Sequence, residues 1–128
     1  MVKLGVRGES TGEEEKYAQA YLKNLRGGMT KLGKLTKSIQ GLPVGKAMTQ
    51  LSFCNLRLAS PIKNLLKSAI TNAENNHGMD MDKLVIHRMD MGRAFTMKRS
   101  RARAKGRGSR IHKPFCHLRI ILAEKEEK

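Results

Sequence analysis

Aromatic and acidic residues are scarce in this sequence, which limits the kind of core that it can form and the kind of partner that it can bind. Tryptophan is absent, and only two tyrosines and three phenylalanines occur. Any hydrophobic core must therefore be aliphatic and rich in methionine. Lysine and arginine number 26 against 11 aspartates and glutamates, which gives a formal net charge of +15. This excess favours a polyanionic partner, with nucleic acid as the first candidate.

Long apolar runs are missing as well. No uninterrupted apolar segment in the 128 residues is long enough to span a membrane, and no basic helix has the aromatic-rich apolar face of a membrane-surface helix. The first seven residues lack the uninterrupted apolar core of a secretory signal. We therefore expect one domain, in an intracellular protein that binds no membrane.

Catalytic and metal-binding signatures are also absent. The sequence contains no Gly-x-Ser-x-Gly motif, no phosphate-binding loop and no Cys-x-x-Cys pair, and its four histidines do not follow zinc spacing. Cys54 and Cys116 are interpreted as buried thiols, because no second pair accompanies them. Asp80, Asp82 and Asp90 could hold a metal, but the first two fit a turn and the third offsets nearby arginines. We predict no enzyme, no metal site, no cofactor and no small-molecule substrate.

The dominant feature is a basic stretch over residues 97–113. Its cations are Lys98, Arg99, Arg101, Arg103, Lys105, Arg107, Arg110 and Lys113. No carboxylate occurs between Met91 and Ala123 to neutralise them. Their like charges repel, and the Ala, Gly and Ser residues among them bury little, so only a polyanion would hold the stretch in one shape. We interpret it as a nucleic-acid-binding arm; a solvated basic loop is the weaker alternative.

Two strands are expected on either side of this arm. Residues 84–91 are rich in β-forming residues, and Cys116, Leu118, Ile120 and Leu122 are apolar at alternate positions. The connection of residues 96–110 is much longer than an ordinary hairpin loop, so the strands should continue outward as a long basic finger. Its glycines at 106 and 108 suit a tight turn, and the proline at 114 suits a strand start or a bulge.

The remainder of the chain favours helices. Residues 1–16 show no periodicity and are predicted to form a flexible tail. Residues 17–25 fit a helix or an edge strand, and the sequence leaves both open. Residues 29–39 predict an amphipathic helix whose outer face carries Lys31, Lys34 and Lys37. Pro43 opens a second, short helix.

The longest helix is predicted after Asn55. Its apolar stripe consists of Ile62, Leu65, Leu66, Ala69, Ile70 and Ala73. Ser60 is an acceptable cap, Pro61 marks the first turn or a kink, and Gly78 is a natural end. We expect the stripe to pack on the sheet formed by the two strands beside the arm.

Five motifs follow one another in a distinctive order. They are Ser-Ala-Ile-Thr-Asn-Ala-Glu-Asn-Asn at 68–76, Asp-Met-Asp-Lys-Leu at 80–84, Met-Lys-Arg at 97–99, Arg-Ala-Lys-Gly-Arg-Gly-Ser-Arg-Ile at 103–111 and Lys-Pro-Phe at 113–115. Over about residues 25–124 the chain resembles the bacterial large-subunit ribosomal protein family numbered twenty-two. The resemblance implies an α+β fold with helices packed on a small three-stranded antiparallel sheet. It also implies a long protruding basic β-hairpin at about 84–123, with a basic tip at about 96–110.

The same resemblance implies a structural constituent of the large ribosomal subunit on a cytoplasmic, or organellar, ribosome. Such a protein binds large-subunit ribosomal RNA, supports subunit assembly and lines the nascent-peptide exit tunnel with its hairpin tip, to which Met97, Lys98 and Arg99 correspond. Its partners would be ribosomal RNA, neighbouring large-subunit proteins and, transiently, the nascent chain. We take residues 17–128 as one RNA-binding domain. The candidate RNA-binding residues are Lys31, Lys34, Lys98, Arg99, Arg101, Arg103, Lys105, Arg107, Arg110 and Lys113.

Two other kinds of protein would also use a basic arm. One is an architectural DNA-binding protein whose arm enters the minor groove. The other is an interaction module whose arm binds an acidic protein. Because aromatic residues occur only at the edges of the basic tract, at Phe95 and Phe115, the sequence favours shape and phosphate recognition of folded RNA over base stacking on single strands.

Overall fold

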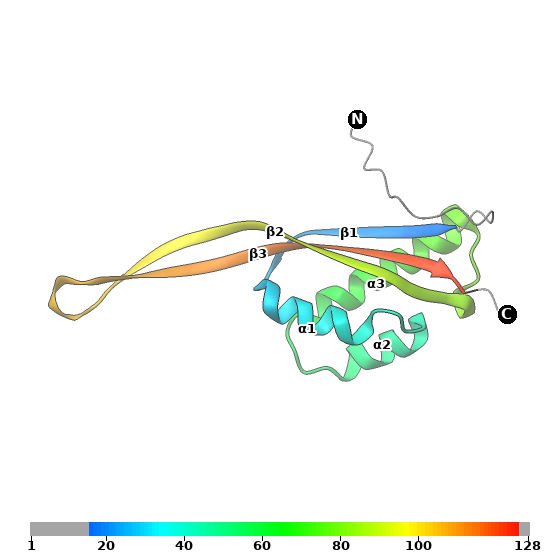
Figure 1. Cartoon of the computed structure of the whole chain (residues 1–128), viewed down its shortest axis with the longest axis horizontal. Coiled ribbons are helices and arrows are strands. Elements are labelled where there is room, and N and C mark those ends of the chain that lie inside the picture. Colours follow the sequence, from blue (N-terminus) through cyan, green and yellow to red (C-terminus); the bar gives the residue numbers. More distant parts are fainter. Residues whose placement is uncertain (1–15, 126–128) are drawn as a thin grey trace, which may run out of the picture.

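The computed structural model describes residues 16–125, and Figure 1 shows a helical and sheet body from which one hairpin protrudes. Apart from Lys16, the predicted flexible tail lies outside the described residues. The strands and helices are β1 (Tyr17–Arg26), α1 (Met29–Ile39), α2 (Val44–Phe53), α3 (Ala59–His77), β2 (Leu84–Ala102) and β3 (Gly108–Glu124). Two single 3-10 turns, Met81–Lys83 and Ala104–Gly106, precede β2 and β3.

The sheet is antiparallel, with strand order β1-β3-β2, so that β3 lies in the centre. The alternate apolar residues predicted for β3 are all buried, and their side chains face the helices. They are Cys116, Leu118, Ile120 and Leu122. The predicted α+β fold, with helices on a three-stranded antiparallel sheet and a long hairpin, is confirmed.

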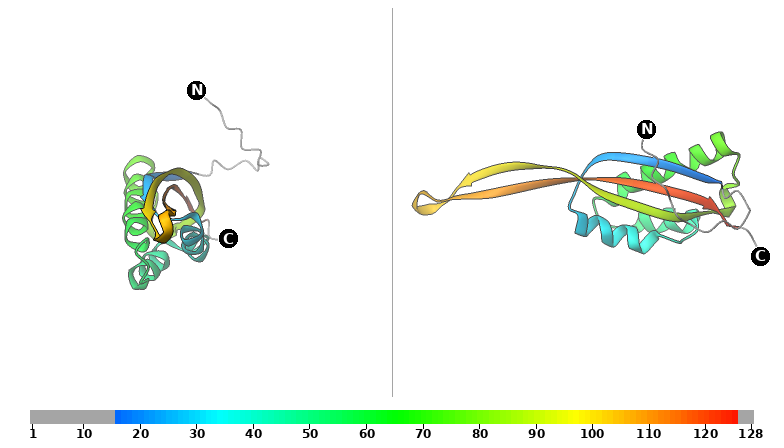
Figure 2. Two further views of the ribbon diagram at one scale, coloured as in Figure 1. Left: turned by 90° about the vertical axis from the view of Figure 1, so that its left-hand side faces the viewer. Right: turned by 45° about the horizontal axis from the view of Figure 1, so that its top comes forward.

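The helices cover one side of the sheet, as Figure 2 shows from two further directions. Contrary to expectation, α3 packs mainly on β1 and β3 rather than on the two hairpin strands. The strand order explains the difference, since β1 adjoins β3 while β2 lies at the other edge, where α1 packs against it. A hydrogen bond from Asn72 Nδ2 to the Gln19 carbonyl, 3.1 Å long, also ties α3 to β1.

The segment that the sequence left open forms strand β1. Its inward residues before the bulge include Ala18 and Ala20, which are buried but too small to give a clear alternating pattern. Tyr17 and Tyr21 lie on the exposed face. A bulge between Leu22 and Leu25, with Asn24 at φ 55°, breaks the alternation further.

The ends of α3 agree only partly with the sequence-based expectation. The helix begins at Ala59, with Leu58 in the N-cap position, so the prediction of Ser60 as the cap was wrong. Pro61 lies in the first turn, where its missing N–H costs no helical hydrogen bond. Gly78 ends the helix at φ 61°, and its N–H donates to the Ala73 and Glu74 carbonyls, as expected for a glycine C-cap.

Aliphatic side chains form the core of the body. The largest fully buried ones include Leu32, Ile62, Leu66, Ile86 and Leu118. Within residues 16–125, no helix is both long and apolar enough to cross a membrane.

Candidate nucleic-acid interface

The basic arm forms the outer half of a continuous two-stranded ladder. Pairing between β2 and β3 runs from Leu84 opposite Glu124 to Ala102 opposite Gly108, with bulges between Ile86 and Arg88 and between Arg93 and Thr96. We call the part beyond the second bulge, residues 96–114, the finger. Its strands twist about each other as they leave the body (Figure 2). The predicted outward continuation of both strands is therefore confirmed.

A tight turn over residues 103–107 closes the finger. The Arg103 N–H donates to the Arg107 carbonyl at 2.7 Å, and the Arg107 N–H donates to the Ala104 carbonyl at 3.4 Å. Lys105 and Gly106 both have positive φ, at 59° and 66°. Glycine adopts this backbone conformation without steric cost, which accounts for Gly106 at the turn. Gly108 instead opens β3.

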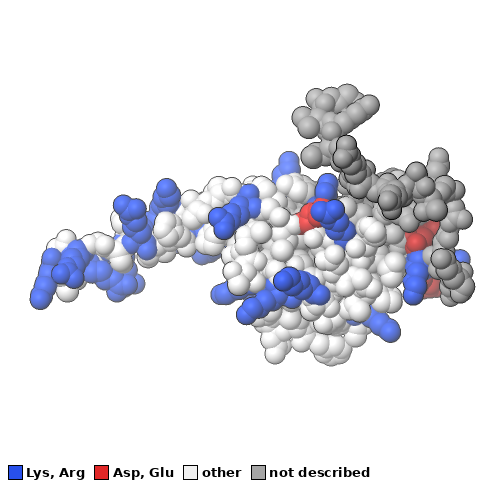
Figure 3. All heavy atoms as spheres, viewed as in Figure 1, with Lys and Arg blue, Asp and Glu red and all other residues white. Residues whose placement is uncertain are grey.

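The predicted RNA-binding cations project from both faces of the finger. Residues paired across an antiparallel ladder share a face. Arg99 opposite Ile111 and Arg101 opposite Ser109 therefore mark one face, and Lys98 opposite His112 marks the other. On the side visible in Figure 3, lysine and arginine side chains extend from both edges of the finger. A polyanion would thus be attracted from more than one direction, which suits an arm enclosed by its partner.

Among the described residues, carboxylates pair with three cations of the body but with none of the finger. Asp90 accepts hydrogen bonds from the side chains of Arg88, at 2.6 Å, and Arg119. Hydrogen bonds from Arg119 contribute most to holding the pKa of Asp90 below its usual value. Partial burial acts in the opposite direction, and the hydrogen bond and charge of Arg88 lower the pKa further. Lys83 pairs with Asp80 at 3.7 Å. Across residues 16–125, no finger cation takes part in an ion pair.

The structure separates the ten candidate RNA-binding residues into three groups. Those from Lys98 to Arg110 lie on the finger, whereas Lys31 and Lys34 are exposed on α1 in the body. Lys113 lies where the finger meets the body and is half-buried. Met97, Lys98 and Arg99, the predicted tunnel-facing residues, lie on β2 before the turn that closes the finger.

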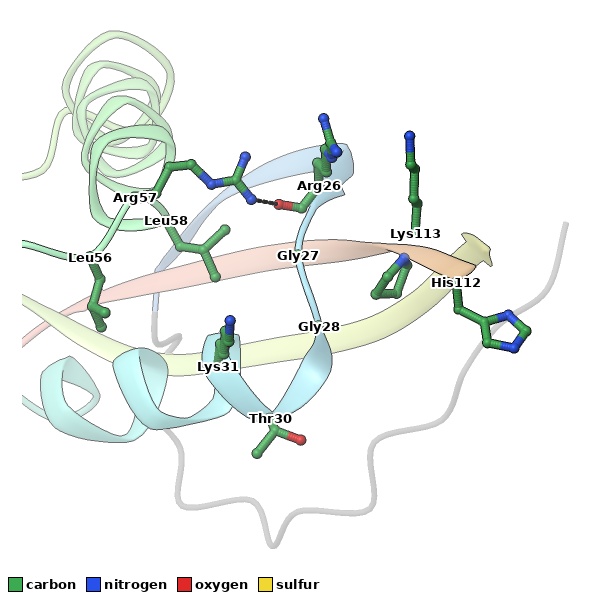
Figure 4. Close-up of a pocket in the computed structure, with 11 residues that line it drawn as sticks. Arg26, Gly27, Gly28, Thr30, Lys31, Leu56, Arg57, Leu58, His112 and Lys113 are labelled. Atoms are coloured by element: carbon green, nitrogen blue, oxygen red, sulfur yellow. Dashed lines mark hydrogen bonds between the residues drawn. The ribbon is translucent and has the colours of Figure 1, made fainter. Parts of the chain in front are cut away.

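Lys113 and Lys31 are brought together with two cations that sequence reasoning missed. A cleft at the root of the finger is lined by Arg26, from the end of β1, and Arg57, from the segment before α3, as well as by the two lysines. Figure 4 shows Arg57 reaching across to Arg26, whose carbonyl accepts its Nη2–H at 2.9 Å. Both arginines stand alone among uncharged neighbours in the sequence, so only the topology reveals them.

Metal-ligating and reactive groups do not form a site. No group of three or more His, Cys, Asp or Glu side chains within residues 16–125 could hold a metal ion. Both cysteines are free; Cys116 is buried as predicted, whereas Cys54 is only half-buried. Burial raises the pKa of the Cys116 thiol, and its sulfur lies 3.4 Å from the Gly27 carbonyl oxygen. This thiol is a structural part of the core.

These features define a basic α+β protein that presents a protruding hairpin of uncompensated cations. The chain belongs to the family described as ribosomal protein L22p/L17e, whose family model matches residues 20–123. Several bacterial relatives named "Large ribosomal subunit protein uL22" are similar to it. The relative from Acidiphilium cryptum is 47% identical over 109 residues, which cover 85% of this chain and 71% of the relative.

Two further relatives with the same name match a similar span. The protein from Agrobacterium fabrum is 47% identical over 111 residues, covering 87% of this chain and 86% of the relative. The protein from Maricaulis maris is 44% identical over 110 residues, covering 86% of this chain and 87% of the relative. The resemblance seen in the sequence motifs is thereby confirmed.

Proposed function

We propose that this protein is a structural constituent of the large ribosomal subunit that binds large-subunit ribosomal RNA through the finger and supports subunit assembly. The observation that carries the proposal is the finger itself, which bears cations on both faces and no carboxylate. Folded RNA offers phosphates on several sides of a narrow arm, so it can neutralise both faces at once. Family membership supports the same role. No catalytic step is part of this function.

In this proposal, residues 17–128 act as one RNA-binding domain on the ribosome. The body would rest against ribosomal RNA and neighbouring large-subunit proteins through α1, where Lys31 and Lys34 are exposed. The finger would extend to the wall of the exit tunnel, with Met97, Lys98 and Arg99 as tunnel-facing residues that meet the nascent chain in passing. Met97 is 36% exposed, an apolar side chain among cations that is available to such a partner.

The proposal is tested by sedimentation of the tagged full chain, expressed in its own cells, through a high-salt sucrose gradient. Many simultaneous phosphate contacts and a close fit to RNA should keep the protein with the large subunit. Release as free protein, or sedimentation with chromosomal DNA, would overturn the proposal and favour an architectural DNA-binding protein. A complex that persists after nuclease digestion of the RNA would instead indicate an acidic protein partner.

A further inference from the structure

Two neighbouring clefts lie at the root of the finger. The first is the basic cleft described above, with a volume of about 540 Å³, and the second has a volume of about 480 Å³. Both volumes are in the range of small-ligand sites. The clefts share the wall formed by Gly27, Gly28, Thr30 and Pro114. One ligand with two chemically different parts could therefore occupy both.

The basic cleft has the chemistry of a phosphate site. Arg26, Lys31, Arg57 and Lys113 line it, and no carboxylate is among its lining residues. The hydrogen bond to the Arg26 carbonyl uses one guanidinium N–H of Arg57, which leaves further donors for a second acceptor. In Figure 4, Arg57 reaches toward Arg26 and Lys31 points up from α1, whereas the His112 ring points away from the basic cleft. The hydrogen bond to the Arg26 carbonyl therefore holds the Arg57 guanidinium in place before an anion binds.

The second cleft has the chemistry of a base-stacking site. Phe95 and Phe115 stack across the ladder with ring centroids 4.5 Å apart and planes 13° from parallel. The bulge between Arg93 and Thr96 displaces the local register and brings the two rings together. Phe95 remains 45% exposed, and both rings line the cleft together with Arg93. No local sequence pattern indicates this arrangement, since the two residues are twenty positions apart.

We propose that the root of the finger holds one unpaired RNA nucleotide, with its base against Phe95 and its phosphate in the basic cleft. This inference rests on the proposed RNA-binding function and adds a defined nucleotide site to it. A phenylalanine pair that only joined two strands would need no cations around it. An unpaired base supplies the aromatic face, and its backbone supplies the anion.

The test uses the full chain and three synthetic RNA hairpins of equal length. One is fully paired, one carries a single-nucleotide bulge, and one carries an abasic residue at the bulge. The bulged RNA should bind about tenfold more tightly than the other two, which is the effect of stacking one base. Equal affinity for all three RNAs would overturn the inference while leaving the ribosomal role intact. Failure to bind any of them, together with failure to sediment with the large subunit, would instead count against the proposed function.

Substitutions then locate the two halves of the site. Phe95→Leu keeps an apolar side chain but removes the aromatic face, so it should abolish the preference for the bulge and leave affinity for paired RNA unchanged. Phe95→Tyr should keep the preference. Arg57→Gln should weaken binding of the bulged RNA more than Lys46→Ala, a control on α2 outside both clefts. A bulge preference that survives Phe95→Leu would show that the base binds elsewhere.

Discussion

Strands β2 and β3 pass through two different environments, and their character changes at the bulge between Arg93 and Thr96. Inside the body, β3 buries an apolar residue at every second position under α3, and the charge of its Arg119 is compensated by Asp90. Beyond the bulge, no side chain is buried, and both faces carry cations. An isolated two-stranded ribbon is at best marginally stable in water. The comparison indicates that the body is stabilised by its own core, and we expect the finger to need a polyanion to hold one shape.

The largest expected effect on stability is that of a substitution in the body part of β3, the strand that runs through both the body and the finger. Leu118 in the body part of β3 is fully buried, whereas Ile111 in the finger part is 38% exposed. Leu118→Ala should lower the free energy of unfolding by about 2–5 kcal/mol, because it leaves a cavity in the core. Ile111→Ala should change it by less than about 0.5 kcal/mol. Denaturant unfolding measures both, and equal losses would show that the finger shares the stability of the body.

Removal of finger charge should affect RNA binding without affecting stability. The variant replaces Arg103, Lys105, Arg107 and Arg110 with alanine. If each contacts a phosphate, the log-log dependence of the binding constant on salt should become less steep by about 3, since each contact contributes roughly 0.7–0.9. Binding to a transcript of large-subunit ribosomal RNA is measured at several salt concentrations.

A body variant of the same charge provides the control for this experiment. It replaces Lys23, Lys46, Lys63 and Lys67 with alanine. These residues lie on β1, α2 and α3, outside both the finger and α1, so the salt dependence should change much less. If the two variants flattened the slope equally, net charge rather than the finger would govern binding.

A smaller effect is expected at Asp90, the last acidic residue before the finger. Its pKa is lowered in the folded state, so its carboxylate stabilises the protein above the unfolded value of about 4, and this contribution is lost as acidification protonates it. Asp90→Asn should cost about 0.5–1 kcal/mol at neutral pH, and the difference from the parent should shrink below about pH 4.

Asp80→Asn is the matched control for this substitution. Asp80 pairs with Lys83 at 3.7 Å, but both side chains are more than half exposed. Urea unfolding at several pH values should therefore show a loss below about 0.5 kcal/mol. A pH-independent loss at Asp90 would mean that packing, not charge compensation, explains its contribution.

The sequence predicted the parts whose physical signal is local. The apolar stripe of α3 and the alternation along β3 each follow from residues close in the chain, and the run of cations required an arm. Strand β1 could not be settled, because its inward residues, Ala18 and Ala20, are small and a bulge interrupts its alternation. Because β1 lies next to β3, α3 packs on β1 and β3. The expectation that α3 would pack on the two hairpin strands was wrong for this reason.

The root of the finger could not be predicted for a related reason. Arg26, Arg57 and Lys113 come from three separate segments, and only the packed body brings them to one cleft. Phe95 and Phe115 stack because a bulge shifts the register between β2 and β3, and no local sequence pattern predicts that bulge. The sequence therefore predicted an RNA-binding arm but not the cluster of cations and aromatic rings at its root.

The division between body and finger is tested most directly by removal of the finger. An Asn-Gly turn in place of residues 98–112 would join Met97 to Lys113, which are paired in register, and would remove seven cations. Cooperative unfolding of this variant is the control for an intact body. The salt dependence of its binding to large-subunit ribosomal RNA is the measurement. We predict a log-log slope less steep than that of the full chain by about 5–6; an unchanged slope would contradict the assignment of the phosphate contacts to the finger.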